Sequence, residues 1–158
     1  MTRHGSNALR VGLVSDTHGL LRPEALRFLR GAHHIIHAGD IGDPAILVSL
    51  RDIAPLTAVR GNNDRERWAR DVPERADLKI GRVVIHVLHN LAELDIDPVG
   101  KYRVIVAGHT HKPMIEERDG VLYVNPGSAG PRRFSLPIAV GELKISGAQV
   151  RVGIRELA

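Results

Sequence analysis

The 158-residue chain contains no cysteine, and aromatic residues make up only 3% of it. Without cysteine there are neither disulfide bonds nor thiolate ligands, so a metal site must use His, carboxylate and amide oxygen ligands. With so few aromatic side chains the core must be aliphatic, and the stacking platforms that bind single-stranded nucleic acid are scarce. We therefore do not expect a nucleic-acid partner.

Long apolar runs are missing as well. No run approaches the length of a membrane span, and Met1 to Arg10 lacks the apolar core of a signal peptide. We expect a cytoplasmic protein with no membrane partner. The formal net charge of +4 favours phosphate-bearing partners only in a general way, because the arginines are scattered along the chain.

The remaining composition is that of an ordinary globular protein, with 43% hydrophobic and 25% charged residues. The length predicts one domain, residues 1–158, that buries about 70% of the surface of its unfolded chain. Strand-like and helix-like patterns alternate in the first half, whereas the second half is mostly strand-like. This order predicts an α/β protein with two packed mixed sheets and helices outside them.

The predicted strands are bounded by turn residues or by polar motifs. They cover residues 9–15, 34–37, 56–59, 78–80, 83–88, 102–107, 114–117, 121–125, 137–145 and 150–154. One helix is predicted to begin at Pro23, and Asp43-Pro44 is typical of the N-cap and first turn of a second helix. Residues 91–102 are predicted to form a short helix and a turn.

Possible metal ligands follow these strands in short motifs. They are Asp16-Thr17-His18, Gly39-Asp40, Gly61-Asn62-Asn63-Asp64, His89-Asn90 and Gly108-His109-Thr110-His111. A carboxylate such as Asp40, at the carboxyl end of a buried strand, lies where open α/β sheets place their chemistry. Asp16 and His18 are two residues apart, so on an extended segment both side chains can reach one ion.

This succession of motifs resembles the calcineurin-like metallophosphoesterase family, and in particular its small single-domain phosphodiesterase branch from bacteria and archaea. The likeness runs from Ser15 to Arg132. It implies a four-layer αββα sandwich of two mixed β-sheets flanked by helices. It also implies two divalent metal ions. The first would be held by Asp16, His18, Asp40 and His111, and the second by Asp40, Asn62, His89 and His109.

The resemblance further implies a hydrolase of phosphoric ester bonds, most specifically a phosphodiesterase with a small phosphate-ester or nucleotide-like substrate. Two ions about 3.5–4 Å apart clamp phosphoryl oxygens and lower the pKa of a bound water, so a bridging hydroxide can attack phosphorus. Asp40, Asn62, Asp64 and His109 are expected to act in catalysis, Asp64 by bracing the Asn62 loop with hydrogen bonds. Nitrogen and oxygen ligands suit manganese, our first choice, and also iron, zinc or nickel.

Several residues have two interpretations. His37 could support the ligands from behind or be a core histidine, whereas His33, His34 and His86 are expected to be structural. Arg132, in the turn that begins at Asn125, could contact phosphate or lie on the surface. The arginine-rich segment around Trp68 could face a substrate, but a solvated helix or loop is the preferred interpretation.

One position departs from the family pattern. Where the wider family has a histidine, and the small branch often cysteine, this chain has Asn63, which is no proton donor of that kind. This departure bears on catalytic efficiency and substrate choice, not on the metal site. A second function class also stays open, because some relatives of the branch resemble a non-catalytic scaffold of the same fold that binds protein partners. All seven ligand positions are filled, which favours the enzyme. A homo-oligomeric state is left open.

Overall fold

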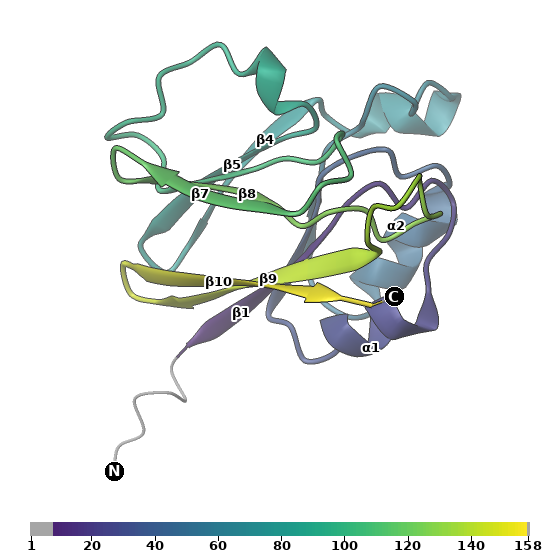
Figure 1. Ribbon diagram of the computed structural model, residues 1–158, viewed down its shortest axis with the longest axis horizontal. Coiled ribbons are helices and arrows are strands. Elements are labelled where there is room, and N and C mark those ends of the chain that lie inside the picture. Colours follow the sequence, from purple (N-terminus) through teal and green to yellow (C-terminus); the bar gives the residue numbers. More distant parts are fainter. Residues whose placement is uncertain (1–7, 158) are drawn as a thin grey trace.

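A computed structural model of the protein describes residues 8–157, so both ends of the predicted domain, 1–158, lie outside the described residues. Two five-stranded sheets are stacked on each other (Figure 1). Sheet A, in the order β10-β9-β1-β2-β3, contains β1 (Leu9–Val14), β2 (His34–His37), β3 (Leu56–Ala58), β9 (Ala139–Ser146) and β10 (Gln149–Glu156). Sheet B, in the order β4-β5-β6-β8-β7, contains β4 (Arg75–Ile80), β5 (Val83–Leu88), β6 (Val104–Val106), β7 (Met114–Arg118) and β8 (Val121–Asn125).

Both sheets are mixed. In sheet A, β1, β2 and β3 are parallel, and β9 runs antiparallel to both β1 and β10. In sheet B, β5, β6 and β8 are parallel, while the edge strands β4 and β7 are antiparallel to their neighbours. The predicted α/β class with two mixed sheets is confirmed.

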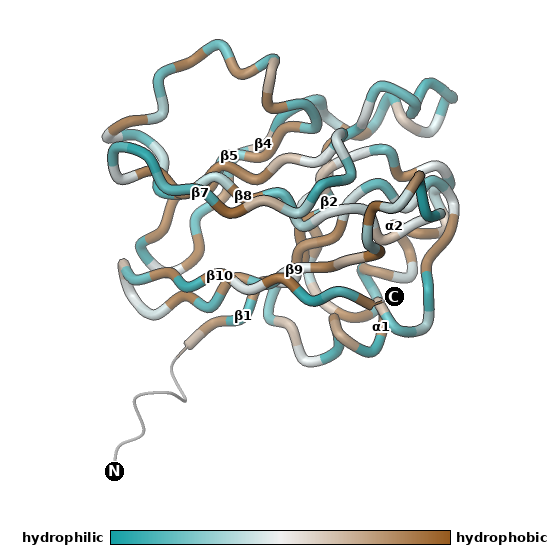
Figure 2. The backbone as a smooth tube through the Cα atoms, in the orientation of Figure 1, coloured by the Kyte–Doolittle hydropathy of each residue, from teal (hydrophilic) through white to brown (hydrophobic). Residues whose placement is uncertain are grey.

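The alternation of side chains along the strands of sheet A places apolar side chains in two separate clusters, one on each face of the sheet. Leu13 and Ile36 point into the core between the sheets, where they meet Val104 and Val106 of sheet B. Their chain neighbours, such as Val14, point to the opposite face of sheet A. Figure 2 shows hydrophobic and hydrophilic stretches alternating along the strands. The largely aliphatic core follows from the scarcity of aromatic residues.

Helices α1 (Pro23–Leu29) and α2 (Pro44–Arg51) cover the outer face of sheet A through Ala25, Leu29 and Leu50. Both helices begin at the predicted proline. The Asp43 carboxylate accepts a hydrogen bond from the backbone N–H of Ala45 at 2.8 Å, which confirms the predicted N-cap. No α-helix within residues 8–157 is both long and apolar enough to cross a membrane.

The outer face of sheet B has a thinner cover. The segment that follows β5 contains a single 3-10 turn, η3 (Leu91–Glu93), and packs Leu91, Leu94 and Tyr102 on a small cluster that includes Ile105. Pro98 and Gly100 in this segment disfavour a longer helix. The fourth layer of the sandwich is therefore mostly irregular chain, as the short predicted helix and turn indicated.

Candidate metal centre

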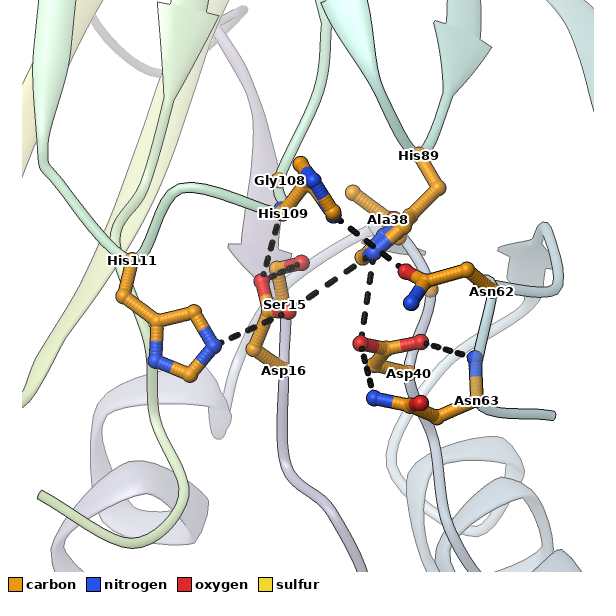
Figure 3. Close-up of polar contacts among 12 residues, drawn as sticks. Ser15, Asp16, Ala38, Asp40, Asn62, Asn63, His89, Gly108, His109 and His111 are labelled. Atoms are coloured by element: carbon orange, nitrogen blue, oxygen red, sulfur yellow. Dashed lines mark hydrogen bonds and ion pairs between the residues drawn. The ribbon is translucent and has the colours of Figure 1, made fainter. Parts of the chain in front are cut away.

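The predicted ligands meet at the carboxyl ends of the strands that precede them. Asp16 and Asp40 follow β1 and β2 of sheet A, and His89 directly follows β5 of sheet B. His109 and His111 come from the loop after β6. Figure 3 shows these side chains pointing toward one another from the two sheets. Residues from distant parts of the chain are thus gathered at one edge of the sandwich.

The first predicted ligand set is compact. The Asp16 Oδ1 atom lies 3.8 Å from His18 Nε2 and 3.4 Å from His111 Nε2. His18 Nε2 in turn lies 3.6 Å from Asp40 Oδ2. One atom each of Asp16, His18 and His111 therefore lies within the span that a single metal ion could fill.

The second predicted ligand set is joined to the first through the carboxylates. His89 Nε2 lies 3.3 Å from Asp40 Oδ2 and 3.9 Å from Asp16 Oδ1. The His109 ring packs edge-on against His89 at 5.2 Å, and His109 Nδ1 lies 3.2 Å from Asn62 Oδ1. Asp16 is consequently as central as Asp40, a feature that the sequence motifs did not predict.

Four side-chain atoms of this cluster are buried without a hydrogen-bond partner among residues 8–157: Asp16 Oδ1, His18 Nε2, His89 Nε2 and His111 Nδ1. Burying polar atoms without partners costs free energy, and proteins rarely do it. Divalent cations would satisfy the first three of these atoms, because carboxylate oxygen and imidazole nitrogen are ligands of such ions. The buried Asp and His groups thus suit a divalent metal ion.

The carboxylates and histidines of the cluster shift one another's pKa values. Burial alone would raise the pKa of Asp40, but the close approach of His89 Nε2 at 3.3 Å, the hydrogen bond from the Asn63 N–H, and the charges of His89 and His18 lower it to about 2. The pKa of Asp16 is lowered in the same way, against burial, by His111, Ser15 and His89. Burial alone would lower the pKa of His89, but the nearby Asp40 and Asp16 carboxylates raise it above its usual value. A metal ion would therefore compete with a proton at His89.

The backbone at the site is held in an uncommon conformation. Five predicted ligands have φ in the left-handed region: Asp16 (55°), His18 (46°), Asp40 (56°), His109 (74°) and His111 (64°). Non-glycine residues seldom adopt this conformation, and those that do cluster at functional sites, where surrounding contacts compensate for the strain. These sharp bends after the strands turn the ligand side chains inward.

Groups that the sequence motifs did not identify orient the ligands. The Ala38 carbonyl accepts a hydrogen bond from His89 Nδ1 at 2.7 Å, which leaves Nε2 facing the cluster. The Ser15 hydroxyl donates to Asp16 Oδ2 at 2.7 Å, and the His109 backbone N–H donates to the same oxygen at 3.1 Å. No sequence signal distinguished Ser15 or the Ala38 carbonyl from their neighbours.

Asp64 occupies the bracing position that its motif predicts. Its carboxylate accepts hydrogen bonds from the backbone N–H groups of Ile41 and Gly42, both at 3.0 Å, and of Gly61 at 2.9 Å. It therefore ties the Asp40 loop to the Asn62 loop. Asn63 contributes from the same loop, since its backbone N–H and its Nδ2 donate to the two oxygens of Asp40 at 3.0 and 3.1 Å.

Two glycines allow these loops to approach so closely. A Cβ atom at Gly61 would lie 2.1 Å from Asp40 Oδ1, and one at Gly108 would lie 2.0 Å from the Ser15 hydroxyl. Both distances are far below van der Waals contact. Any larger residue at either position would displace the carboxylates of the cluster.

His37 is fully buried, as a core histidine would be, and it also supports the ligand loops through hydrogen bonds. Its Nδ1 accepts a hydrogen bond from the Gly39 N–H at 3.0 Å, and its Nε2 hydrogen-bonds the Thr17 hydroxyl at 3.0 Å. Thr17 donates onward to the Ile41 carbonyl at 2.8 Å. The neutral ring thus links the loops that carry Asp16 and Asp40 from behind.

Because the His37 ring is buried, we expect the folded protein to lose stability toward unfolding in acid. Burial, the largest effect, lowers the pKa of His37 from 6.5 to about 4, against the raising effect of nearby Asp16 and Asp64. The unfolded chain therefore binds this proton more readily between pH 6.5 and 4, and folding stability falls as pH drops through that window. At roughly 1.4 kcal/mol per pH unit, the loss from His37 is about 3 kcal/mol.

Urea unfolding of chelator-treated protein at pH 7 and at pH 4 measures this effect. His37→Gln is expected to lose about 3 kcal/mol less than the wild type between the two pH values. His33→Gln, which replaces an exposed ring, is the control and should retain the wild-type loss. Equal losses in all three proteins would exclude His37 as the source.

Within residues 8–157, the histidines expected to be structural, His33, His34 and His86, lie outside the cluster. His33 Nδ1 accepts from the Arg10 N–H at 2.9 Å, and His34 Nε2 lies 2.8 Å from the Thr57 hydroxyl. His86 faces the outer side of sheet B, where Nδ1 lies 2.6 Å from Asp77 Oδ1 and the ring packs against Tyr102.

Two further residues with open interpretations have structural contacts. Arg132 is exposed and donates to the Leu136 carbonyl at 3.3 Å, which favours the surface-turn interpretation. Trp68 lies in the 3-10 helix η2 (Arg67–Asp71) and packs against the core under α1 and α2. A substrate-facing role for Trp68 has no support in these contacts.

His86 and His89 form a natural pair for a metal-content test, because they are three residues apart and face opposite sides of sheet B. His89→Ala is expected to lose one metal ion per chain, whereas His86→Ala should keep the wild-type content. Elemental analysis of the purified variants after metal loading measures the difference. Loss of metal from His86→Ala alone would contradict the assignment of this segment.

Comparison with known proteins supplies independent findings. The family model described as the calcineurin-like phosphoesterase superfamily domain matches residues 9–147. A probable metallophosphoesterase from Methanothermobacter thermautotrophicus is 31% identical over 157 residues, which cover 89% of this chain and 88% of the relative.

Solved structures agree with the fold. An archaeal phosphodiesterase superposes with a TM-score of 0.76 at 26% identity, covering 93% of this chain and all of the other. Vps29 from Chaetomium thermophilum also superposes with a TM-score of 0.76, covering 95% of this chain and 97% of the other. Its identity of 19% makes that likeness one of fold alone.

Proposed function

The chain belongs to the calcineurin-like phosphoesterase superfamily, and from that premise we propose that it is a metal-dependent phosphodiesterase with a dinuclear centre. An archaeal phosphodiesterase of known structure, 26% identical to this chain, supports a diester substrate. The observation that carries the proposal is the convergence of three buried, unpartnered ligand atoms on Asp16, His18 and His89.

Seven side chains would hold the two ions. Asp16, His18, Asp40 and His111 would bind the first, and Asp40, Asn62, His89 and His109 the second. Asp40 Oδ2 supports a bridging role, because it lies between His18 Nε2 at 3.6 Å and His89 Nε2 at 3.3 Å. Manganese is the proposed metal, and iron, zinc and nickel suit the same oxygen and nitrogen ligands.

When bound, divalent ions supply Lewis acidity toward phosphoryl oxygens and a nucleophile from water at neutral pH. The protein's own groups keep the ligands in position. Ser15 and the His109 N–H hold Asp16, the Ala38 carbonyl sets the orientation of His89, and Asp64 holds the Asp40 loop. Both carboxylate oxygens of Asp64 already accept hydrogen bonds from backbone N–H groups, so we propose a positioning role for it rather than a chemical one.

The direct test is a hydrolysis screen with chelator-treated protein. Phosphate monoesters and diesters are assayed without metal and then with manganese, iron, zinc or nickel. We expect no turnover without metal, recovery with manganese, and higher kcat/KM for diesters than for monoesters. Metal binding without hydrolysis of any ester would instead favour the scaffold alternative, in which the fold only binds partners.

A further inference from the structure

A cavity of about 300 Å³ opens beside the metal centre. It lies near the ends of β3 and β4, the edge strands of the two sheets, and Asn62 and His89 border it on the side of the metal centre. Its charged wall is formed by Arg60, Glu74, Arg75 and Glu93. A group joined to a phosphate at the metal centre would therefore enter this cavity directly.

Both arginines of the wall are already paired with carboxylates. Arg60 contacts Glu74 at 2.9 Å and donates to the Val72 carbonyl at 3.0 Å. Arg75 contacts Asp95 at 2.7 Å and donates to the Glu93 carbonyl at 2.6 Å. Since both guanidinium groups are occupied by carboxylates and carbonyls, the cavity is poorly suited to a second phosphate.

The cavity also has little apolar surface to offer a hydrocarbon chain, because Leu88 is the one large apolar side chain in its wall. The polar groups that remain are the Nδ2 amide groups of Asn62 and Asn90, the Glu93 carboxylate, and two arginines held in place by ion pairs, because Asn62 Oδ1 lies against His109 and Asn90 Oδ1 accepts from the Ala92 N–H. Amides hydrogen-bond the edges of bases and sugars, and planar guanidinium groups stack on aromatic rings.

From these features we infer that the cavity binds the nucleoside part of a nucleotide phosphodiester while its phosphate lies at the metal centre. This inference rests on the proposed function, because it assigns a substrate class to the same site. It places specificity in Arg60, Arg75 and Asn90, none of which is a proposed metal ligand.

Binding measurements test the inference without depending on turnover. Calorimetry with manganese-loaded protein compares thymidine 5′-phosphate, methyl phosphate and hexyl phosphate, which share a phosphate and differ in the attached group. We expect thymidine 5′-phosphate to bind at least about tenfold more tightly than the other two. Equal affinities, or an equally tight hexyl phosphate, would overturn a nucleoside site.

A variant that fills the cavity tests whether the preference for thymidine 5′-phosphate arises there. The Glu93 side chain lies exposed at the cavity wall and makes no hydrogen bond or ion pair within residues 8–157, so Glu93→Trp adds bulk without breaking a contact. This variant is expected to lose the tenfold preference and to keep the wild-type affinity for methyl phosphate. Glu24→Trp, an equivalent change at an exposed position in the first turn of α1, should keep the preference.

A preference that survives in Glu93→Trp would show that the nucleoside binds elsewhere and would overturn the inference. Hydrolysis of methyl p-nitrophenyl phosphate by the same preparations tests the proposed function separately. Nucleotide preference without hydrolysis would refute the phosphodiesterase and retain the cavity assignment. Hydrolysis without nucleotide preference would do the opposite.

Discussion

Replacement of Asp40 by asparagine is expected to lower phosphodiester hydrolysis by more than about 100-fold and to remove at least one metal ion per chain. Loss of groups that merely orient metal ligands typically costs 10- to 100-fold, so loss of a bridging carboxylate should cost more. The Asn63 N–H donates to Asp40 Oδ1 at 3.0 Å, and an amide oxygen can still accept that bond. The fold should therefore survive the substitution.

Asp43→Asn is the matched control for this experiment. It makes the same chemical change three residues away, at the exposed N-cap of α2, and asparagine caps helices as well as aspartate does. Activity and metal content are measured for both variants after identical metal loading. Wild-type activity and metal content in Asp40→Asn would rule out the dinuclear proposal.

Aryl phosphodiesters are expected to be hydrolysed far faster than alkyl phosphodiesters, because Asn63 brings no titratable proton to the site. Its side chain donates to Asp40 Oδ2 at 3.1 Å. An aryl alcohol leaves readily as its anion, whereas an alkyl or ribose alcohol needs protonation in the transition state. General acid catalysis contributes about 10²- to 10⁴-fold, so its absence should slow alkyl esters by a factor in that range.

The measurement is the slope of log kcat/KM against the pKa of the leaving group. The wild-type slope is expected to be steep, and Asn63→His should flatten it by raising the alkyl rates selectively. Asn63→Gln keeps an amide at this position and should retain the steep slope. A shallow slope in the wild type would mean that another residue supplies the proton.

Local features of the sequence determined much of this fold. The strand His34–His37 and the helix that follows Asp43-Pro44 lie where they were predicted, because strand alternation, capping and proline geometry act over a few residues. The seven predicted ligands also lie together, since each follows a strand and the parallel strands end at the same edge. The extent of the domain to residues 1 and 158 remains a prediction.

Tertiary structure decided what surrounds those ligands. The Ala38 carbonyl reaches His89 across 51 residues of sequence, and Asp16 receives the His109 N–H across 93. Such contacts depend on how the two sheets pack, so no local pattern encodes them. The same packing makes Asp16 as central as Asp40, and it leaves a cavity near the edge strands, where Arg60 and Arg75 pair with acidic side chains.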